Sequence, residues 1–107
     1  MLLRGASFME RFFFAKVNME KHRIHYIFSG DVQGVGFRSA ACWKARELGV
    51  TGWVKNIYDG TVEMEAQGTL AELAALVEGL RHQLFIMVEN IQSREIPVID
   101  EEGFHIR

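Results

Sequence analysis

The chain of 107 residues contains a single cysteine and no long hydrophobic run. Cys42 alone cannot form an internal disulfide, and one Cys with four scattered His offers no structural zinc site. We therefore expect a reducing, cytoplasmic setting and no bound metal. No stretch approaches the roughly 18 apolar residues of a membrane span, so we expect no membrane contact. The formal net charge is only −2 and basic residues form no run, which argues against nucleic acid as a partner.

The composition, 49% hydrophobic and 24% charged, is ordinary for one small globular domain. Residues 1–21 differ from the rest: they carry four basic and two acidic residues, whereas residues 22–107 carry eight basic and twelve acidic residues. We expect 1–21 to be an N-terminal extension, either packed on the domain or frayed, and 22–107 to be the domain. The extension lacks the long apolar core and the cleavage signal of a secretory peptide. Its helically spaced apolar residues are Phe8, Met9, Phe12 and Phe13.

The first half of the domain alternates strand and helix signals. Residues 24–29 are β-branched and aromatic at alternate positions and stop at Gly30, which predicts a strand. Residues 37–48 have apolar positions at helical spacing and are followed by Gly49, which predicts a helix and its end. Residues 50–56 and 61–67 flank an Asp-Gly pair and predict a β-hairpin.

The second half contains another helix and two more strands. Thr69 and Glu72 have the spacing of a capping box, and the helix they open is predicted to run to about Arg81. Its expected core-facing stripe is Leu70, Leu73, Ala74, Val77 and Leu80. Residues 87–94 and 104–106 alternate as strands. The order strand, helix, strand, strand, helix, strand predicts an α+β fold, the ferredoxin-like βαββαβ sandwich, with an antiparallel sheet and both helices on one face.

The loop of residues 30–36 contains three glycines between a strand and a helix. Such a loop can turn its backbone N–H groups inward beside the positive end of the helix, which suits an anion. The alternative is that a tight turn simply needs glycine. Arg38 favours the anion site, because a cation in the first helical turn opposes the helix dipole unless it shares an anion. The loop is neither a P-loop, since no Lys-Ser/Thr pair follows a glycine, nor a dinucleotide fingerprint, which fails at Ser39.

Two segments, GDVQGVGFR at 30–38 and GWVKNIYDGTVE at 52–63, closely resemble the acylphosphatase family. The resemblance implies the ferredoxin-like fold, no cofactor, and hydrolysis of a small acyl phosphate to a carboxylate and inorganic phosphate. It makes Arg38 the phosphate-binding arginine and Asn56 the water-orienting asparagine. The phosphate cradle that it implies consists of Gln33, Gly34, Val35, Gly36 and Phe37.

These residue types suit the implied chemistry. An acyl phosphate releases a carboxylate, which needs little help from a general acid, so the site must hold the phosphoryl group and place a water in line. The neutral amide of Asn56 can bind a water through both a donor and an acceptor but cannot remove its proton. Without the companion loop, an Asn before a turn would be read as a backbone cap.

The remaining features are assigned as follows. Asp31 lies within the loop, where a carboxylate would weaken phosphate binding unless it points outward. Residues 83–87 are unusually apolar and are candidates to cover extra surface or to form a dimer contact, so we expect a monomer or weak dimer. Trp43 and Trp53 are expected to be packing residues. Glu63 and Glu65 are expected to face solvent.

Two other functions remain open at this stage. One is a catalytically weak module that binds acyl or carbamoyl phosphates, since the domain that this chain resembles also occurs fused to larger maturation enzymes. Turnover of an acyl phosphate would distinguish it from the enzyme. The other is a ferredoxin-like RNA binder, but its characteristic aromatic and basic strand motif is absent from this sequence.

Overall fold

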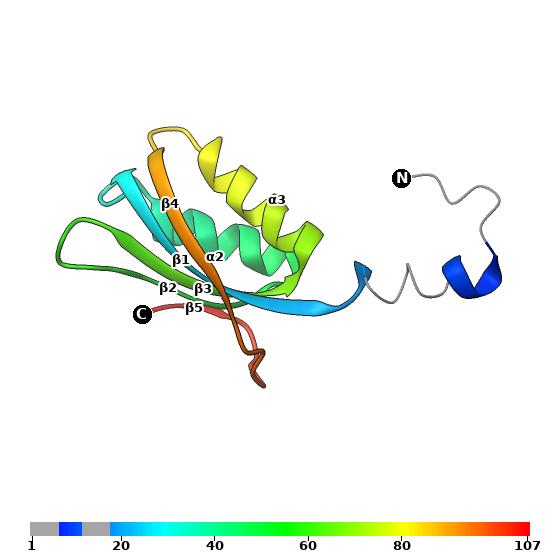
Figure 1. Ribbon diagram of the computed structural model, residues 1–107. Helices are drawn as coiled ribbons and strands as arrows, with labels where there is room; N and C mark the ends of the chain where they lie inside the picture. Colours follow the sequence, from blue (N-terminus) through cyan, green and yellow to red (C-terminus); the bar gives the residue numbers. More distant parts are fainter. Residues whose placement is uncertain (1–6, 12–17) are drawn as a thin grey trace.

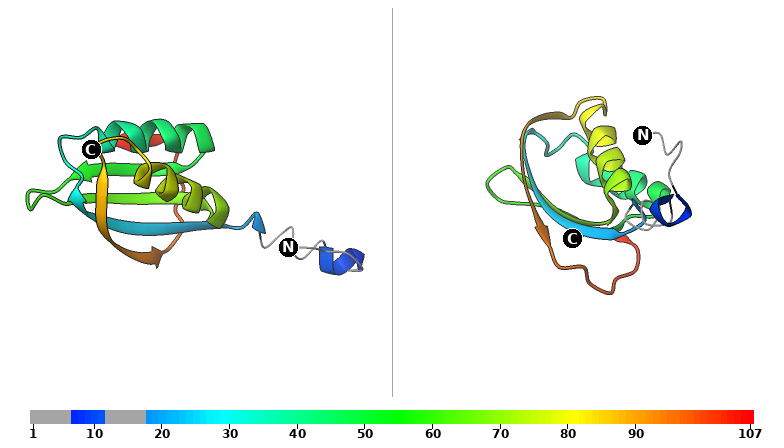
Figure 2. Two further views of the ribbon diagram at one scale, coloured as in Figure 1. Left: turned by 90° about the horizontal axis from the view of Figure 1, so that it is seen from above. Right: turned by 45° about the vertical axis from the view of Figure 1, so that its right-hand side comes forward.

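A computed structural model describes residues 7–11 and 18–107 of the chain. The elements in chain order are β1 (Lys21–Asp31), α2 (Phe37–Leu48), β2 (Thr51–Asn56), β3 (Val62–Thr69), α3 (Leu70–Arg81), β4 (Met87–Ile96) and β5 (Phe104–Ile106). Both helices cover one face of a single sheet and leave the other face open (Figures 1 and 2). The predicted βαββαβ fold is therefore confirmed.

The sheet was predicted to be antiparallel, but it is mixed. Its strand order is β4-β1-β3-β2-β5; the first four strands pair antiparallel, and β5 pairs parallel to β2. The reason lies in the connection of residues 97–103, which passes from the β4 edge to the opposite edge and reverses direction. Because β4 runs antiparallel to β2, the reversal makes β5 run parallel to β2.

The core lies between the sheet and the helices. Along β1 the side chains of Tyr26 and Phe28 are buried on the helix side, as the alternation predicted. The ring of Phe28 packs against the ring of Phe37, the first residue of α2, and the two ring centroids are 4.9 Å apart. Ala41 and Ala45 continue this buried stripe, and Gly49 ends the helix in the left-handed conformation. The glycine loop therefore connects two elements that are both fixed by core packing.

The start of α3 confirms the capping box, and the predicted buried stripe is confirmed in part. Thr69 Oγ1 accepts from the N–H of Glu72, and the Glu72 carboxylate accepts from the N–H of Thr69. The buried side chains are Leu73, Leu76 and Leu80, whereas Leu70 and Ala74 are exposed. Leu73 and Leu80 were predicted to face the core, and Val77, also predicted, is partly buried against it.

The two tryptophans differ in their surroundings. Trp53 is buried, and Arg107 lies over its ring at 4.5 Å from the centroid. Trp43 is 75% exposed, so its prediction as a packing residue is wrong. It belongs to α2 but lies off the buried stripe of that helix.

The N-terminal apolar face was predicted at Phe8, Met9, Phe12 and Phe13, of which Phe12 and Phe13 lie outside the described residues. Residues 8–11 are helical, and Ser7 Oγ accepts from the N–H of Glu10 at the start of this turn. The side chains of Phe8 and Met9 are exposed.

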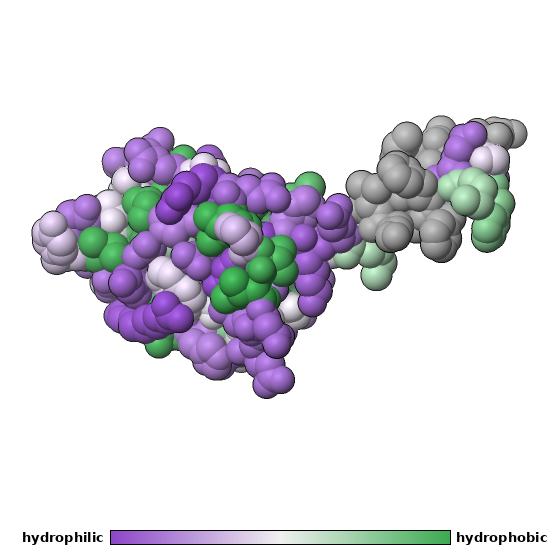
Figure 3. Space-filling view, turned by 60° about the horizontal axis from the view of Figure 1, so that its bottom comes forward, coloured by the Kyte–Doolittle hydropathy of each residue, from purple (hydrophilic) through white to green (hydrophobic). Residues whose placement is uncertain are grey.

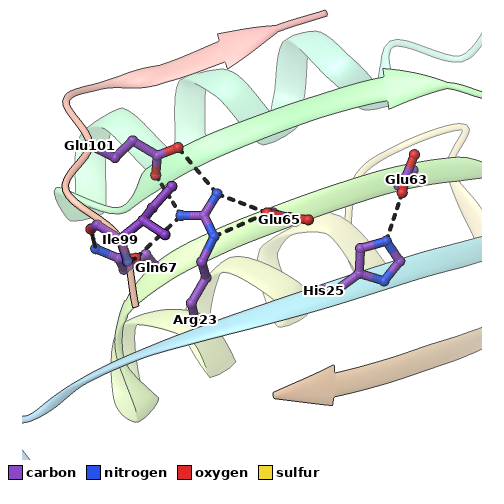
Figure 4. A network of polar contacts seen from close by, with 7 residues as sticks. All are labelled: Arg23, His25, Glu63, Glu65, Gln67, Ile99 and Glu101. Carbon is purple, nitrogen blue, oxygen red and sulfur yellow. Dashed lines mark hydrogen bonds and ion pairs between the residues drawn. The ribbon is translucent and has the colours of Figure 1, made fainter. Parts of the chain in front are cut away.

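The open face of the sheet is mainly hydrophilic, with hydrophobic side chains in small separate groups (Figure 3). Here the guanidinium of Arg23, only 1% exposed, donates to the carboxylates of Glu65 at 3.1 Å and Glu101 at 2.7 Å (Figure 4). Gln67 Nε2 donates to the main-chain oxygen of Ile99, and Gln67 Oε1 accepts from the N–H of Ile99. These bonds hold the connection of residues 97–103 that leads into β5.

The same contacts correct the prediction that Glu63 and Glu65 face solvent. Both carboxylates are largely covered, Glu65 by Arg23 and Glu63 by His25, whose Nε2 lies 2.7 Å from Glu63 Oε2. Burial would raise the pKa of Glu101, but the hydrogen bonds and charge of Arg23 outweigh it and hold that pKa below its ordinary value. Alternation placed these side chains on the correct face, but it gave no sign that Arg23 and His25 cover them.

Candidate active site

The glycine loop, the β2–β3 hairpin and the C-terminal end of β5 meet at one end of the molecule (Figure 1). They enclose a cavity of about 190 Å³. Its lining residues are Val32, Gly34, Gly36, Phe37, Arg38, Ser39, Asn56 and Ile106. The two residues predicted to be catalytic, Arg38 and Asn56, thus lie on one cavity although 18 positions separate them in the sequence.

Two glycines of the loop and the N-terminus of α2 line this cavity. Gly34 and Gly36 have φ of 74° and 81°, a left-handed conformation that costs other residues energy. Gly36 is the N-cap of α2, and no side chain caps the helix. The first N–H groups of an α-helix have no partner within the helix, so those of α2 are left for a ligand at its positive end. This geometry suits the binding of an anion largely by backbone groups.

Arg38 adds a full positive charge to the cradle. It is the second residue of α2, its side chain is exposed, and the first turn of this helix contains no acidic residue. Within the described residues no hydrogen bond or ion pair engages the guanidinium of Arg38, unlike that of Arg23. Its planar fork is therefore free to receive two oxygens of an anion.

Asn56 faces the cradle from the last position of β2. Its backbone pairs with Val62, directly before the hairpin, so the position of its side chain is fixed by the sheet. The oxygen Oδ1 is buried and has no hydrogen-bond partner within the described part of the chain. A buried amide oxygen without a partner is costly to the folded protein, and such atoms commonly mark a site that a water or ligand completes.

Two residues of the predicted cradle do not line the cavity. The side chain of Gln33 instead donates from Nε2 to the main-chain oxygens of Ile57 at 2.7 Å and Thr61 at 2.8 Å. It thereby ties the loop to the hairpin that follows Asn56. Val35 is half-buried and lines a neighbouring groove.

Three lining residues, Val32, Ser39 and Ile106, were not predicted. Ser39 follows Arg38 in the first turn of α2, and that position was a signal available in the sequence. Val32 is a buried anchor of the loop. Ile106 reaches the site because β5 pairs with β2 in parallel, a pairing that sequence periodicity does not reveal. Asp31 does not line the cavity, and its side chain is exposed.

The described residues offer no group of three or more His, Cys, Asp or Glu side chains arranged to hold a metal ion. None of the helices formed by these residues is long and apolar enough to cross a membrane. Arg38 and the N-terminal end of α2 place positive charge at the cavity.

Comparisons with known proteins give a consistent result. Residues 24–106 match the family model described as acylphosphatase. The chain is 46% identical over 80 residues to an acylphosphatase of Bifidobacterium longum, an alignment that covers 74% of this chain and 82% of the relative. The structure of an acylphosphatase from Coxiella burnetii superposes with a TM-score of 0.76 at 41% identity, over 81% of this chain and 93% of that one. That of acylphosphatase from Bacillus subtilis gives 0.75 at 34% identity, over 80% and 98%.

Proposed function

Since the chain belongs to the acylphosphatase family, we propose that its glycine loop and Arg38 hold the phosphoryl group of an acyl phosphate while Asn56 orients the attacking water. Its reaction is hydrolysis of an acyl phosphate to a carboxylate and inorganic phosphate. We assign this reaction to the domain of residues 22–107 and treat residues 1–21 as an extension outside the catalytic machinery.

The reaction is a displacement at phosphorus. The oxygen of a water molecule forms a bond to phosphorus while the bond from phosphorus to the carboxylate oxygen breaks, and the carboxylate leaves with the bonding electrons. Both hydrogens of the water end on the phosphate, so acyl phosphate and water give a carboxylate and dihydrogen phosphate. The substrate's own phosphoryl oxygen takes the proton, and no protein base is needed.

Arg38 and the cradle supply the electrostatic part of catalysis. The equatorial oxygens of the phosphoryl group carry the negative charge of the transition state, and fixed donors around them lower its energy without reorganising. The N–H groups of the loop and of the α2 N-terminus provide such donors, and the guanidinium of Arg38 adds two in one plane. This field takes the place of a metal ion, so we propose a metal-independent reaction without a cofactor.

The observation that carries the proposal is the unpartnered, buried Oδ1 of Asn56 on the same cavity as Arg38. A water held there donates one hydrogen bond to Oδ1, and this bond aims the lone pair of the water oxygen into the cavity. The amide has no proton affinity at neutral pH, so Asn56 positions the nucleophile rather than deprotonating it.

Release of inorganic phosphate from benzoyl phosphate tests the proposal, measured against the spontaneous hydrolysis of the same solution. We expect saturable turnover that inorganic phosphate inhibits competitively, and its loss in Arg38→Lys and Asn56→Ala. Undiminished turnover in both variants would contradict the assigned roles.

A further inference from the structure

A second hollow, of about 510 Å³, opens beside the phosphate cavity. Gly36 and Ser39 line both, so the two are continuous. Beyond these shared residues the second hollow is lined by Val35 of the glycine loop, by residues of α2 and by the turn between α3 and β4. Its large side chains are those of Trp43, Leu84 and Phe85. We call this hollow the acyl groove.

The acyl groove is apolar and uncharged. Trp43, Leu84 and Phe85 are each about three-quarters exposed, at 75%, 76% and 77%. Exposed apolar side chains gathered beside a cavity mark a binding surface more often than chance scatter does. None of the described residues lining the groove bears a formal charge. It is wider and more open to solvent than the phosphate cavity.

The backbone at Phe85 shows that the aromatic side chain is held there against local preference. The N–H of Ile86 donates to the oxygen of Gln83 at 3.2 Å, which closes a four-residue turn with Phe85 in third place. Phe85 has φ of 75°, and within the described residues it is the only non-glycine residue with a positive φ. This turn position suits glycine, and a bulky residue is uncommon there. Residues that break a local rule are frequently functional.

The geometry of the substrate connects the two hollows. In an acyl phosphate one bridging oxygen separates phosphorus from the acyl carbon, so an acyl group begins directly outside the phosphate cavity. Trp43 lies one helical turn beyond Ser39 on α2, on the side where the cavity and the groove join. A flat apolar group leaving the cavity past Ser39 therefore meets the rings of Trp43 and Phe85, which favour aromatic partners.

We propose that the acyl groove binds the acyl group of the substrate and selects apolar, preferably aromatic, acyl phosphates. This inference rests on the proposed function, because it requires the phosphoryl group in the adjacent cavity. Trp43 and Phe85 are specificity residues: they contact the part of the substrate that does not react. An acyl group that carries a second carboxylate is disfavoured, because the groove offers that charge no partner.

The test compares kcat/KM for benzoyl phosphate and acetyl phosphate in the full chain. The variants are Trp43→Ala and Phe85→Gly, and the matched control is Leu70→Ser, which also removes an exposed apolar side chain but at the start of α3. Glycine relieves the positive φ at residue 85, so Phe85→Gly keeps the fold, which thermal unfolding verifies. We expect the ratio of benzoyl to acetyl phosphate to fall about tenfold in each groove variant, mainly through KM, and to stay at the wild-type value in the control.

The outcomes separate this inference from the function on which it rests. An unchanged ratio in Trp43→Ala and Phe85→Gly, with both substrates hydrolysed, overturns the acyl groove and leaves the proposed function intact. Failure of the wild-type chain to hydrolyse either substrate overturns the proposed function itself. A third outcome is that the ratio of benzoyl to acetyl phosphate kcat/KM in the wild type varies with protein concentration, and that the groove variants abolish only this variation. The groove would then be a contact between copies of the chain, which overturns its role as a substrate site.

Discussion

The side-chain amide of Gln33 donates a hydrogen bond of 2.7 Å to the main-chain oxygen of Ile57, the residue that follows Asn56. The same nitrogen donates to Thr61 across the hairpin. One side chain of the glycine loop thus ties this loop to the backbone directly after Asn56, which holds Arg38 and Asn56 on the cavity at one spacing.

Removing this link lowers turnover without abolishing phosphate binding. In Gln33→Ala the hairpin loses two hydrogen bonds to the loop, and small displacements in an active site are costly, so we expect kcat to fall about tenfold or more. Gln33→Glu is expected to be worse, because a carboxylate would face two carbonyl oxygens and repel the anionic substrate. Steady-state kinetics with thermal unfolding checks both variants. Equal turnover in Gln33→Ala and the wild type would show that Gln33 does not position the hairpin for catalysis.

Arg38 is expected to depend on the shape of its guanidinium and not only on its charge. Lysine keeps the charge but presents it at one point, so Arg38→Lys should lower kcat/KM by about 10² or more and weaken competitive inhibition by phosphate in parallel. Arg94→Lys, an exposed change on β4, is the matched control. Wild-type phosphate affinity in Arg38→Lys would show that Arg38 is not the anchor.

Chelation is expected to leave activity unchanged. In the proposed mechanism backbone N–H groups and Arg38 supply the positive field at the cavity, so turnover of benzoyl phosphate should be the same before and after prolonged exposure to EDTA. Loss of turnover that Mg²⁺ or Zn²⁺ restores would place a metal ion in the reaction.

Stability should fall in acid through Glu101. Its folded pKa lies below the ordinary value, so the pair with Arg23 stabilises the fold fully above the unfolded pKa of about 4.3. As the pH falls below this value towards the folded pKa, only the unfolded state takes up the proton, and the stabilisation is lost. Glu101→Gln should lower the free energy of unfolding at pH 7 by about 1.5–3 kcal/mol.

Denaturant unfolding of wild type and Glu101→Gln between pH 7 and pH 3 measures this effect. The difference in unfolding free energy should shrink below about pH 4.3. Glu102→Gln is the control, since the side chain of the neighbouring Glu102 is exposed. If the difference in unfolding free energy between wild type and Glu101→Gln did not change with pH, the stabilisation would not come from the charge of Glu101.

Most of the fold was predictable because its signals are local. Gly49 after α2, the capping box of Thr69 and the Asp-Gly turn each specify an element end from neighbouring residues. The parallel pairing of β5 and the cover over Arg23 were not predictable, because both depend on the path of residues 97–103, which carries no periodic pattern. The exposure of Trp43 likewise reflects which face of α2 meets the sheet.

The site divides in the same way. Arg38 and Asn56 were found through two motifs, and the structure brings both to one cavity. The side chain of Gln33 was expected in the cradle but binds the hairpin, since a sequence motif names a position without giving its direction. Ile106 and the part of the acyl groove formed by residues 83–85 come from chain segments far from both motifs. Only the assembled sheet places them beside the loop.

The most direct test of the central claim compares Asn56→Ala and Asn56→Asp in turnover and in competitive inhibition by inorganic phosphate. If the amide only positions water, Ala should lower kcat by ~10² or more and leave phosphate affinity unchanged, because the loop and Arg38 are intact. Asp should be no better than Ala, since its charge repels the substrate. Asn90→Ala, on exposed β4, is the control. Near wild-type turnover in Asn56→Asp, or loss of phosphate binding in Asn56→Ala, would contradict the orienting role.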